Sequence, residues 1–220
     1  MSYEGVIFDF DGVLLDAAFD DWKWAEKARR EKARELGYEI DGNGRHGFLF
    51  QTDSLDEMKQ MVEENGFTWH DYIEVEKAAA ARKAEMVRNG EMGLFPDARQ
   101  VLREIEVPKA VVSNAFGATL EDIVLQLGID DHLEFWAAPR LSEIEKYHEM
   151  MKPETHMLED ALEVLGTRNA VMIGDSDFDI RAAKNAGIDS VLIDRGKAVD
   201  VEPDHVVDSL EEFSRLVREG

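Results

Sequence analysis

Residues 6–13 read VIFDFDGV, an apolar run that leads directly into two aspartates at alternate positions and then a glycine. The run Val6–Phe8 has the pattern of a strand buried on both faces, which is typical of a parallel strand covered by helices. A strand that ends in two carboxylates, Asp9 and Asp11, either emerges into solvent or holds the two charges in place for chemistry. The rest of the sequence distinguishes between these two interpretations.

Further short apolar runs of the same kind follow along the chain, separated by segments in which apolar residues recur with helical spacing. Strands that alternate with amphipathic helices predict an α/β fold with a doubly wound parallel sheet. The three further predicted strands are Ala110–Val112, Ala170–Ile173 and Ser190–Ile193.

One part of the chain breaks this alternation, because between Asp16 and Gly93 only helical patterns are found and no buried strand. We therefore expect an α/β core made of residues 1–16 and 93–220, with residues 17–92 inserted as an α-helical cap. The helices predicted within the insert are Trp22–Leu36, Ser54–Asn65, where Ser54 and Glu57 form a capping box, and Trp69–Asn89.

The composition limits the possible partners. Of 220 residues, 48 are Asp or Glu and 25 are Lys or Arg, which gives a formal net charge of −23. Nucleic acids and anionic membrane surfaces repel such a chain, and no apolar run is long enough to span a bilayer. The absence of cysteine excludes disulfides and thiolate sites. We expect a cytoplasmic, halophilic protein whose acidity suits a saline cell interior.

Polar residues follow the predicted strands at the point where each strand ends. Asp9 and Asp11 follow the first strand, Ser113 and Asn114 follow the second, and the segment Gly174–Asp179 follows the third. Because ligands bind beyond the carboxyl ends of the strands in doubly wound sheets, these groups are expected to converge. Alone, each residue type is a common helix cap or turn residue. A fourth segment, Lys152-Pro153-Glu154, precedes the helix before the third strand and adds an ammonium group.

This ordered set resembles the motifs of the haloacid dehalogenase-like hydrolase superfamily, in particular its phosphoglycolate-phosphatase-like members with an α-helical cap. The resemblance covers nearly the whole chain. The four matching motifs are Asp9-Phe10-Asp11-Gly12-Val13, Val112-Ser113-Asn114, Lys152-Pro153-Glu154 and Gly174–Asp179.

The resemblance implies a role for each site residue. Asp9 is expected to be the nucleophile that attacks phosphorus, and Asp11 the general acid and base. Ser113 and Lys152 are expected to be catalytic and to hold the transferred oxygens. The expected substrate-binding residues are Gly12, Ser113, Asn114, Lys152 and Arg45 of the cap, and the expected Mg²⁺ ligands are Asp9, Asp11 through its carbonyl, Asp175 and, in a supporting role, Asp179.

The pair of aspartates also bears on the type of reaction. Dehalogenases of the superfamily lack the second aspartate, so Asp11 favours phosphoryl transfer. We expect a Mg²⁺-dependent phosphatase that hydrolyses a small phosphorylated metabolite through an aspartyl-phosphate intermediate, as a monomer or homodimer. The alternatives are a sugar phosphomutase and a non-catalytic aspartyl-phosphate switch or binding protein. The polar segment Pro139–Met151 has no functional explanation.

The net charge of −23 generates a first prediction. The repulsive field reaches about 30 Å at 0.01 M ionic strength and only about 3 Å at 1 M. Salt should relieve self-repulsion in the folded state and admit an anionic substrate, so we expect Tm and kcat/KM both to rise between tens of millimolar and molar KCl. Thermal melts and initial rates across that range measure this. A flat or falling Tm would refute the halophilic interpretation.

Overall fold

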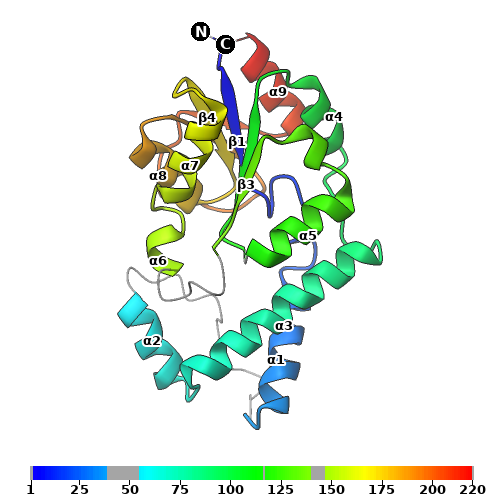
Figure 1. Cartoon of the computed structure of the whole chain (residues 1–220), viewed down its shortest axis with the longest axis vertical. Coiled ribbons are helices and arrows are strands. Elements are labelled where there is room, and N and C mark those ends of the chain that lie inside the picture. The colour runs from blue at the N-terminus through cyan, green and yellow to red at the C-terminus, as the bar shows by residue number, and fades with distance from the viewer. Residues whose placement is uncertain (1, 39–54, 116, 140–146, 220) are drawn as a thin grey trace. The chain divides into compact units, whose positions relative to one another are not determined.

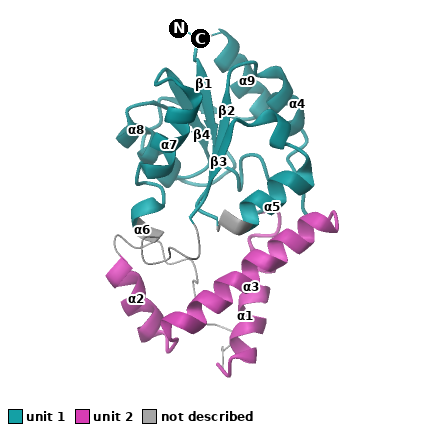
Figure 2. Ribbon diagram, in the orientation of Figure 1, with its two compact units in different colours: residues 1–17, 92–220 teal, residues 18–91 magenta. Residues whose placement is uncertain are grey.

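The structure is a computed structural model that describes residues 2–38, 55–115, 117–139 and 147–219. It divides into two compact units, Met1–Ala17 with Met92–Gly220 and Ala18–Glu91 (Figure 2). Each unit is described by itself below. The sequence predicted a core of residues 1–16 and 93–220 and a cap of residues 17–92, and the role of the second unit as a cap remains a prediction.

In the described residues, the first unit is built on a sheet of six parallel strands in the order β3-β2-β1-β4-β5-β6. Figure 1 shows β1 inside this unit, between helices α7 and α8 on one side and α4 and α9 on the other. The chain starts in the middle of this sheet and winds outward in both directions, which confirms the doubly wound fold. The strands are β1 (Gly5–Phe8), β2 (Lys109–Val112), β3 (Phe135–Ala137), β4 (Ala170–Gly174), β5 (Asp189–Ile193) and β6 (His205–Val207).

The four strands predicted from the sequence are β1, β2, β4 and β5, and all four are confirmed. The prediction missed β3 and β6, which form the two edges of the sheet. Each has only three residues, and most of these are partly or fully exposed, so neither shows the continuous apolar pattern of a strand buried on both faces.

Helices cover both faces of the sheet, and alternate residues of β1 point to opposite layers. Ile7 packs in a cluster with Leu158 and Leu162 of α7 and Ala183 of α8, whereas the ring of Phe8 meets Phe213 of α9 edge-on at 5.6 Å. The helices of this unit are α4 (Ala98–Glu104), α5 (Gly117–Leu127), α6 (Tyr147–Met150), α7 (His156–Leu165), α8 (Asp177–Ala186) and α9 (Leu210–Glu219).

The central position of β1 and β4 decides where a site can form. These neighbours run in register, with Val6 opposite Val171 and Phe8 opposite Ile173, so their carboxyl ends lie at the same height. The strand order also changes direction between them, and such switch points are where doubly wound sheets bind ligands. Within the described residues, no helix has the length and apolar character that a membrane crossing requires.

In its described residues, 18–38 and 55–91, the second unit contains the helices α1 (Lys23–Glu35), α2 (Leu55–Glu64) and α3 (Trp69–Arg88), which confirms the helical prediction for these residues. Thr68 caps α3, because its hydroxyl accepts the backbone N–H of Asp71 at 3.1 Å. The predicted cap residue Ser54 and the predicted substrate residue Arg45 lie outside the described residues.

A buried ion pair joins α1 to α3. Arg29 Nη2 donates to Glu76 Oε2 at 2.9 Å, and the two side chains are only 11% and 4% exposed. Burial raises the pKa of Glu76 and the Arg29 guanidinium opposes this shift, leaving the pKa above its ordinary value. The carboxylate therefore depends on Arg29 to remain ionised inside the unit.

Replacing Arg29 by methionine should leave a buried carboxylate without its partner and lower the free energy of unfolding by about 3–5 kcal/mol at pH 7. Because the pKa of Glu76 is then raised further in the folded state, the loss should shrink as pH falls toward the ordinary carboxyl range. Denaturant unfolding at pH 5 and 7 measures both effects. The control Lys77→Met removes an exposed pair with Glu74 and should lower stability far less. Equal losses in the two variants would contradict this account.

Candidate active site

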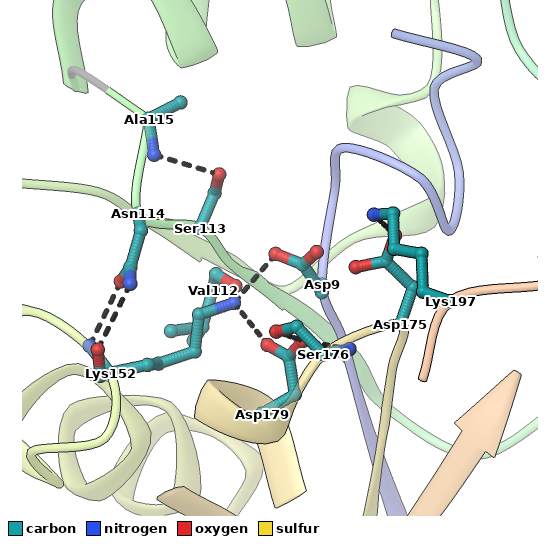
Figure 3. Close-up of polar contacts among 10 residues, drawn as sticks. All are labelled: Asp9, Val112, Ser113, Asn114, Ala115, Lys152, Asp175, Ser176, Asp179 and Lys197. Atoms are coloured by element: carbon teal, nitrogen blue, oxygen red, sulfur yellow. Dashed lines mark hydrogen bonds and ion pairs between the residues drawn. The ribbon is translucent and has the colours of Figure 1, made fainter. Parts of the chain in front are cut away.

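The ammonium of Lys152 is the centre of the site (Figure 3). Its Nζ donates to Asp9 Oδ1 and to Asp179 Oδ1, both at 2.6 Å, and to the carbonyl oxygen of Val112 at 2.9 Å. These bonds use all three protons of an ammonium. Lys152 is 3% exposed, so one buried cation joins the ends of β1 and β2 to the first turn of α8.

Asp179 is held from both sides. Its Oδ2 accepts the hydroxyl of Ser176 at 2.5 Å and the backbone N–H of Ser176 at 3.2 Å, which is a capping box at the start of α8. A side chain on Gly174 would not fit here, because a Cβ atom at that position would lie 2.1 Å from Asp179 Cβ. Both carboxylate oxygens of Asp179 are therefore engaged, Oδ1 by Lys152 and Oδ2 by Ser176.

The end of β2 holds the backbone of Lys152. The side-chain amide of Asn114 donates to the Lys152 carbonyl at 3.0 Å, and its oxygen accepts the Lys152 N–H at 2.9 Å. Ser113 is buried, and its hydroxyl accepts the N–H of Ala115 at 3.1 Å. The side chain of Asn114 therefore positions the lysine segment.

Burial is the largest influence on the pKa values of Asp9 and Lys152. Burial raises the pKa of Asp9 to about 8, Lys152 opposes the shift, and Asp179 and Asp175 reinforce it. For Lys152, burial alone lowers the pKa, but Asp179 and Asp9 together raise it above its ordinary value. The lysine is thus firmly protonated, while one ammonium is not enough to compensate three neighbouring acids.

Asp175, at the end of β4, has a different cation. Its Oδ2 forms an ion pair with Nζ of Lys197, a residue of the connection between β5 and β6. Burial raises the pKa of Asp175, and the bond to Lys197 opposes that shift. The same carboxylate lies directly against Gly12, where a Cβ atom would be 2.2 Å from Asp175 Oδ2.

Two residues that the sequence analysis did not select also lie at this edge, Arg195 and Lys197. Arg195 Nε donates to the carbonyl of Gly12 at 3.3 Å, and its guanidinium lies 3.8 Å from the ring centroid of Phe95. The signal that would have identified both is their place directly after β5, since the carboxyl ends of parallel strands share one edge.

The structure thus brings most of the predicted site residues to one edge of the sheet. Asp11 is half-buried in a tight loop, closed by the N–H of Gly12 bonding to the carbonyl of Leu15 at 2.8 Å. Arg45 lies outside the described residues. The predicted residues found at the carboxyl ends of β1, β2 and β4, or held against them, are Asp9, Asp11, Gly12, Ser113, Asn114, Lys152, Asp175 and Asp179.

The donor set fits a divalent cation. One carboxylate oxygen from each of Asp9, Asp175 and Asp179 lies within 4.8 Å of the others, and all three residues are buried. When ionised, these three carboxylates carry one more charge than the ammonium groups of Lys152 and Lys197 neutralise, which leaves a net negative charge. Hard oxygen donors of this kind suit Mg²⁺. Asp9 and Asp175 are the ligands to expect first, because Asp179 is already bonded through both oxygens.

Comparison with known proteins identifies the family to which the chain belongs. A sequence model of the haloacid dehalogenase-like hydrolase family matches residues 3–187, which span every motif of the site. The chain belongs to the haloacid dehalogenase-like hydrolase family. In this hydrolase, the matched region covers all of the Asp9, Ser113, Lys152 and Asp175 segments and ends at the C-terminal end of α8.

Relatives of this hydrolase align along most of their length. It is 28% identical to a glyceraldehyde 3-phosphate phosphatase of Methanopyrus kandleri, covering 98% of this chain and 97% of that protein. It is 29% identical to a phosphoglycolate phosphatase of Neisseria meningitidis, covering 88% and 81%. The crystal structure of CbbY from Rhodobacter sphaeroides in complex with phosphate has the same fold, with a TM-score of 0.73, 20% identity and 96% of each chain covered.

The contact between Gly12 and Asp175 generates a prediction with a matched control. Gly12 and Gly90 both have positive φ, 86° and 73°, but nothing lies within 4 Å of a Cβ atom at Gly90. Gly90→Ala should cost about 1 kcal/mol of backbone strain. Gly12→Ala adds overpacking against Asp175 and should cost about 1–3 kcal/mol more, measured by denaturant unfolding. Equal costs would mean that Asp175 does not constrain position 12.

Proposed function

We propose that this hydrolase is a Mg²⁺-dependent phosphatase that cleaves small phosphomonoesters, with Asp9 as the nucleophile. The observation that carries the proposal is the bond from the buried Lys152 ammonium to Asp9 Oδ1, at 2.6 Å. This bond fixes the carboxylate at the end of β1 and leaves its other oxygen, Oδ2, outside that bond for attack.

The reaction then has two balanced steps. Asp9 Oδ2 attacks phosphorus, the bond from phosphorus to the substrate oxygen breaks, and Asp11 protonates the departing alcohol. In the second step Asp11 takes a proton from water, the water oxygen attacks phosphorus, and inorganic phosphate leaves with Asp9 restored as a carboxylate. The Ser113 hydroxyl and backbone N–H groups after β1 and β2 would stabilise the transferred oxygens.

Mg²⁺ held by Asp9, Asp175 and the Asp11 carbonyl would supply the positive charge that lets a phosphate dianion enter a site of buried carboxylates. Lys152 contributes in a different way. Its three protons are used by Asp9, Asp179 and Val112, so a bond to a phosphoryl oxygen requires exchanging one of these partners. We therefore assign Lys152 first to orienting Asp9, and Asp179 to supporting Lys152.

The substrate we propose is a small phosphorylated metabolite of a few carbon atoms. The relatives named for glyceraldehyde 3-phosphate and for phosphoglycolate support this size class. The proposal extends to the setting in which the enzyme works, a saline cytoplasm, which the net charge of −23 favours. A screen of phosphomonoesters with Mg²⁺ at low and high KCl is the direct experiment, and turnover of none of them would refute the assignment.

Replacement of Asp9 by asparagine should abolish turnover while the fold persists, because an amide oxygen is a poor nucleophile and no other carboxylate is held in its place. Initial rates with the best substrate of the screen, together with a thermal melt, measure both effects. Retention of a tenth of the parent rate, with deamidation excluded by mass spectrometry, would remove Asp9 from this role.

Asp11→Asn should lower kcat by about 10²–10⁴-fold for alkyl phosphates, the range typical of general acid–base groups. With 4-nitrophenyl phosphate the first step needs no proton donor, because nitrophenolate is a good leaving group. The rate of nitrophenol release in a single turnover should therefore fall much less. The same loss for both substrates would contradict the assignment of Asp11 as general acid.

A further inference from the structure

The connection between β5 and β6 is hydrogen-bonded to loops at the carboxyl ends of the strands, the edge of the sheet where the candidate active site lies. Asp177 Oδ1, at the start of α8, accepts the backbone N–H groups of Asp200 at 2.8 Å and of Val201 at 2.9 Å. Near the other end of the connection, Arg195 bonds to the carbonyl of Gly12. Both ends are thus tied to the loops that carry the site, which explains the acidic residue Asp177 of the Gly174–Asp179 motif.

These anchors place Lys197 on Asp175. The Lys197 ammonium pairs with Asp175 Oδ2, the atom that lies against Gly12 (Figure 3). The two partners differ sharply in exposure, because the Asp175 side chain is 6% exposed and that of Lys197 is 44% exposed. A buried anion is therefore neutralised by a cation that reaches it from solvent on a flexible four-carbon stem.

The two lysines of the site therefore differ in how easily their ammonium groups can move into solvent. Lys152 is 3% exposed and donates three bonds, to Asp9, Asp179 and the Val112 carbonyl, so moving its ammonium into water breaks all three. Lys197 has its ion pair with Asp175 and needs only a rotation of its stem to transfer its charge to solvent. Only the second can be exchanged for another cation at low cost.

We propose that Lys197 is a tethered competitor of the divalent metal ion for Asp175, and that it sets the metal affinity of the enzyme. This inference rests on the proposed function, in which Asp175 is a metal ligand. A divalent ion and an ammonium repel each other and need the same buried carboxylate, so binding of the metal drives Lys197 into solvent. When the metal leaves, the ammonium returns, and the buried carboxylate is never left without a counter-ion.

Two measurable consequences follow. Removing the Lys197 charge should make the metal bind more tightly, because the ion no longer has to displace a partner. The metal-free protein should become less stable, because Asp175 then has no exchangeable cation, and saturating Mg²⁺ should close that gap. A merely structural anchor would instead destabilise the metal-free and the metal-bound protein alike.

The test uses the full chain freed of metal by chelation, titrated with Mg²⁺ by calorimetry at one fixed KCl concentration. Lys197→Gln should lower the Kd for Mg²⁺ by roughly tenfold, the order expected for losing one partly exposed charge-assisted bond. Its Tm in EDTA should lie below that of the parent, with the difference closing at saturating Mg²⁺. Lys197→Arg keeps the charge and should keep a Kd near that of the parent.

Lys184→Gln is the matched control. Lys184 contacts the same connection, through the carbonyl of Glu202, but lies near the C-terminal end of α8 and does not bond to Asp175. Its removal changes the net charge equally and should leave the Kd unchanged. Equal tightening in this control, or a Kd of Lys197→Gln that is unchanged or weaker, would overturn the inference. If the parent itself binds no Mg²⁺, the metal site of the proposed function fails as well, which distinguishes the two failures.

Discussion

The bonds from one buried ammonium to Asp9, Asp179 and the Val112 carbonyl are the constraint on which the rest of the site depends. Carboxylates at this depth are costly unless a cation accompanies them, and a lone buried lysine is equally costly. Together they form a network that is stable only when every member is present. The network fixes Asp9 at the end of β1, and the proposed chemistry follows from that position.

The fold makes this network possible through the order of its strands. β1 lies between β2 and β4, so the residues that follow these three strands share one edge, and α8 begins immediately beside it. Two glycines allow the close packing, Gly174 against Asp179 and Gly12 against Asp175. The acidic residues that would repel each other are thereby held within 4.8 Å, a separation suited to a shared cation.

The apolar patterns of the sequence predicted the strands that are buried on both faces. The runs at Val6–Phe8 and Ala170–Ile173 are apolar on both faces, so they were recognisable as central strands, and the polar residues after them were recognisable as site candidates. The edge strands β3 and β6 were missed because a strand with an exposed side has no such pattern.

Residues that act through long-range contacts were harder to predict. The position of Lys197 after β5 indicates the edge of the sheet at which it lies, but the sequence does not indicate which residue there it pairs with, namely Asp175, 22 residues earlier. Asp177 was visible only as part of an acidic motif, and its bonds to the backbone of Asp200 and Val201 give it an anchoring role. For Asp179 the sequence indicated the metal site, whereas its bonds to Lys152 and Ser176 favour a positioning role.

The central claim is that the Lys152 network makes Asp9 the acceptor of the phosphoryl group. Trapping the acyl phosphate tests this most directly: the enzyme is mixed with substrate and Mg²⁺, quenched in acid within the first turnover and reduced with borohydride. Reduction converts an aspartyl phosphate into homoserine, which peptide mass spectrometry can locate. The account predicts homoserine at position 9 alone. Homoserine at position 11 or 175, or unmodified aspartate at position 9 under conditions of full phosphate release, would contradict it.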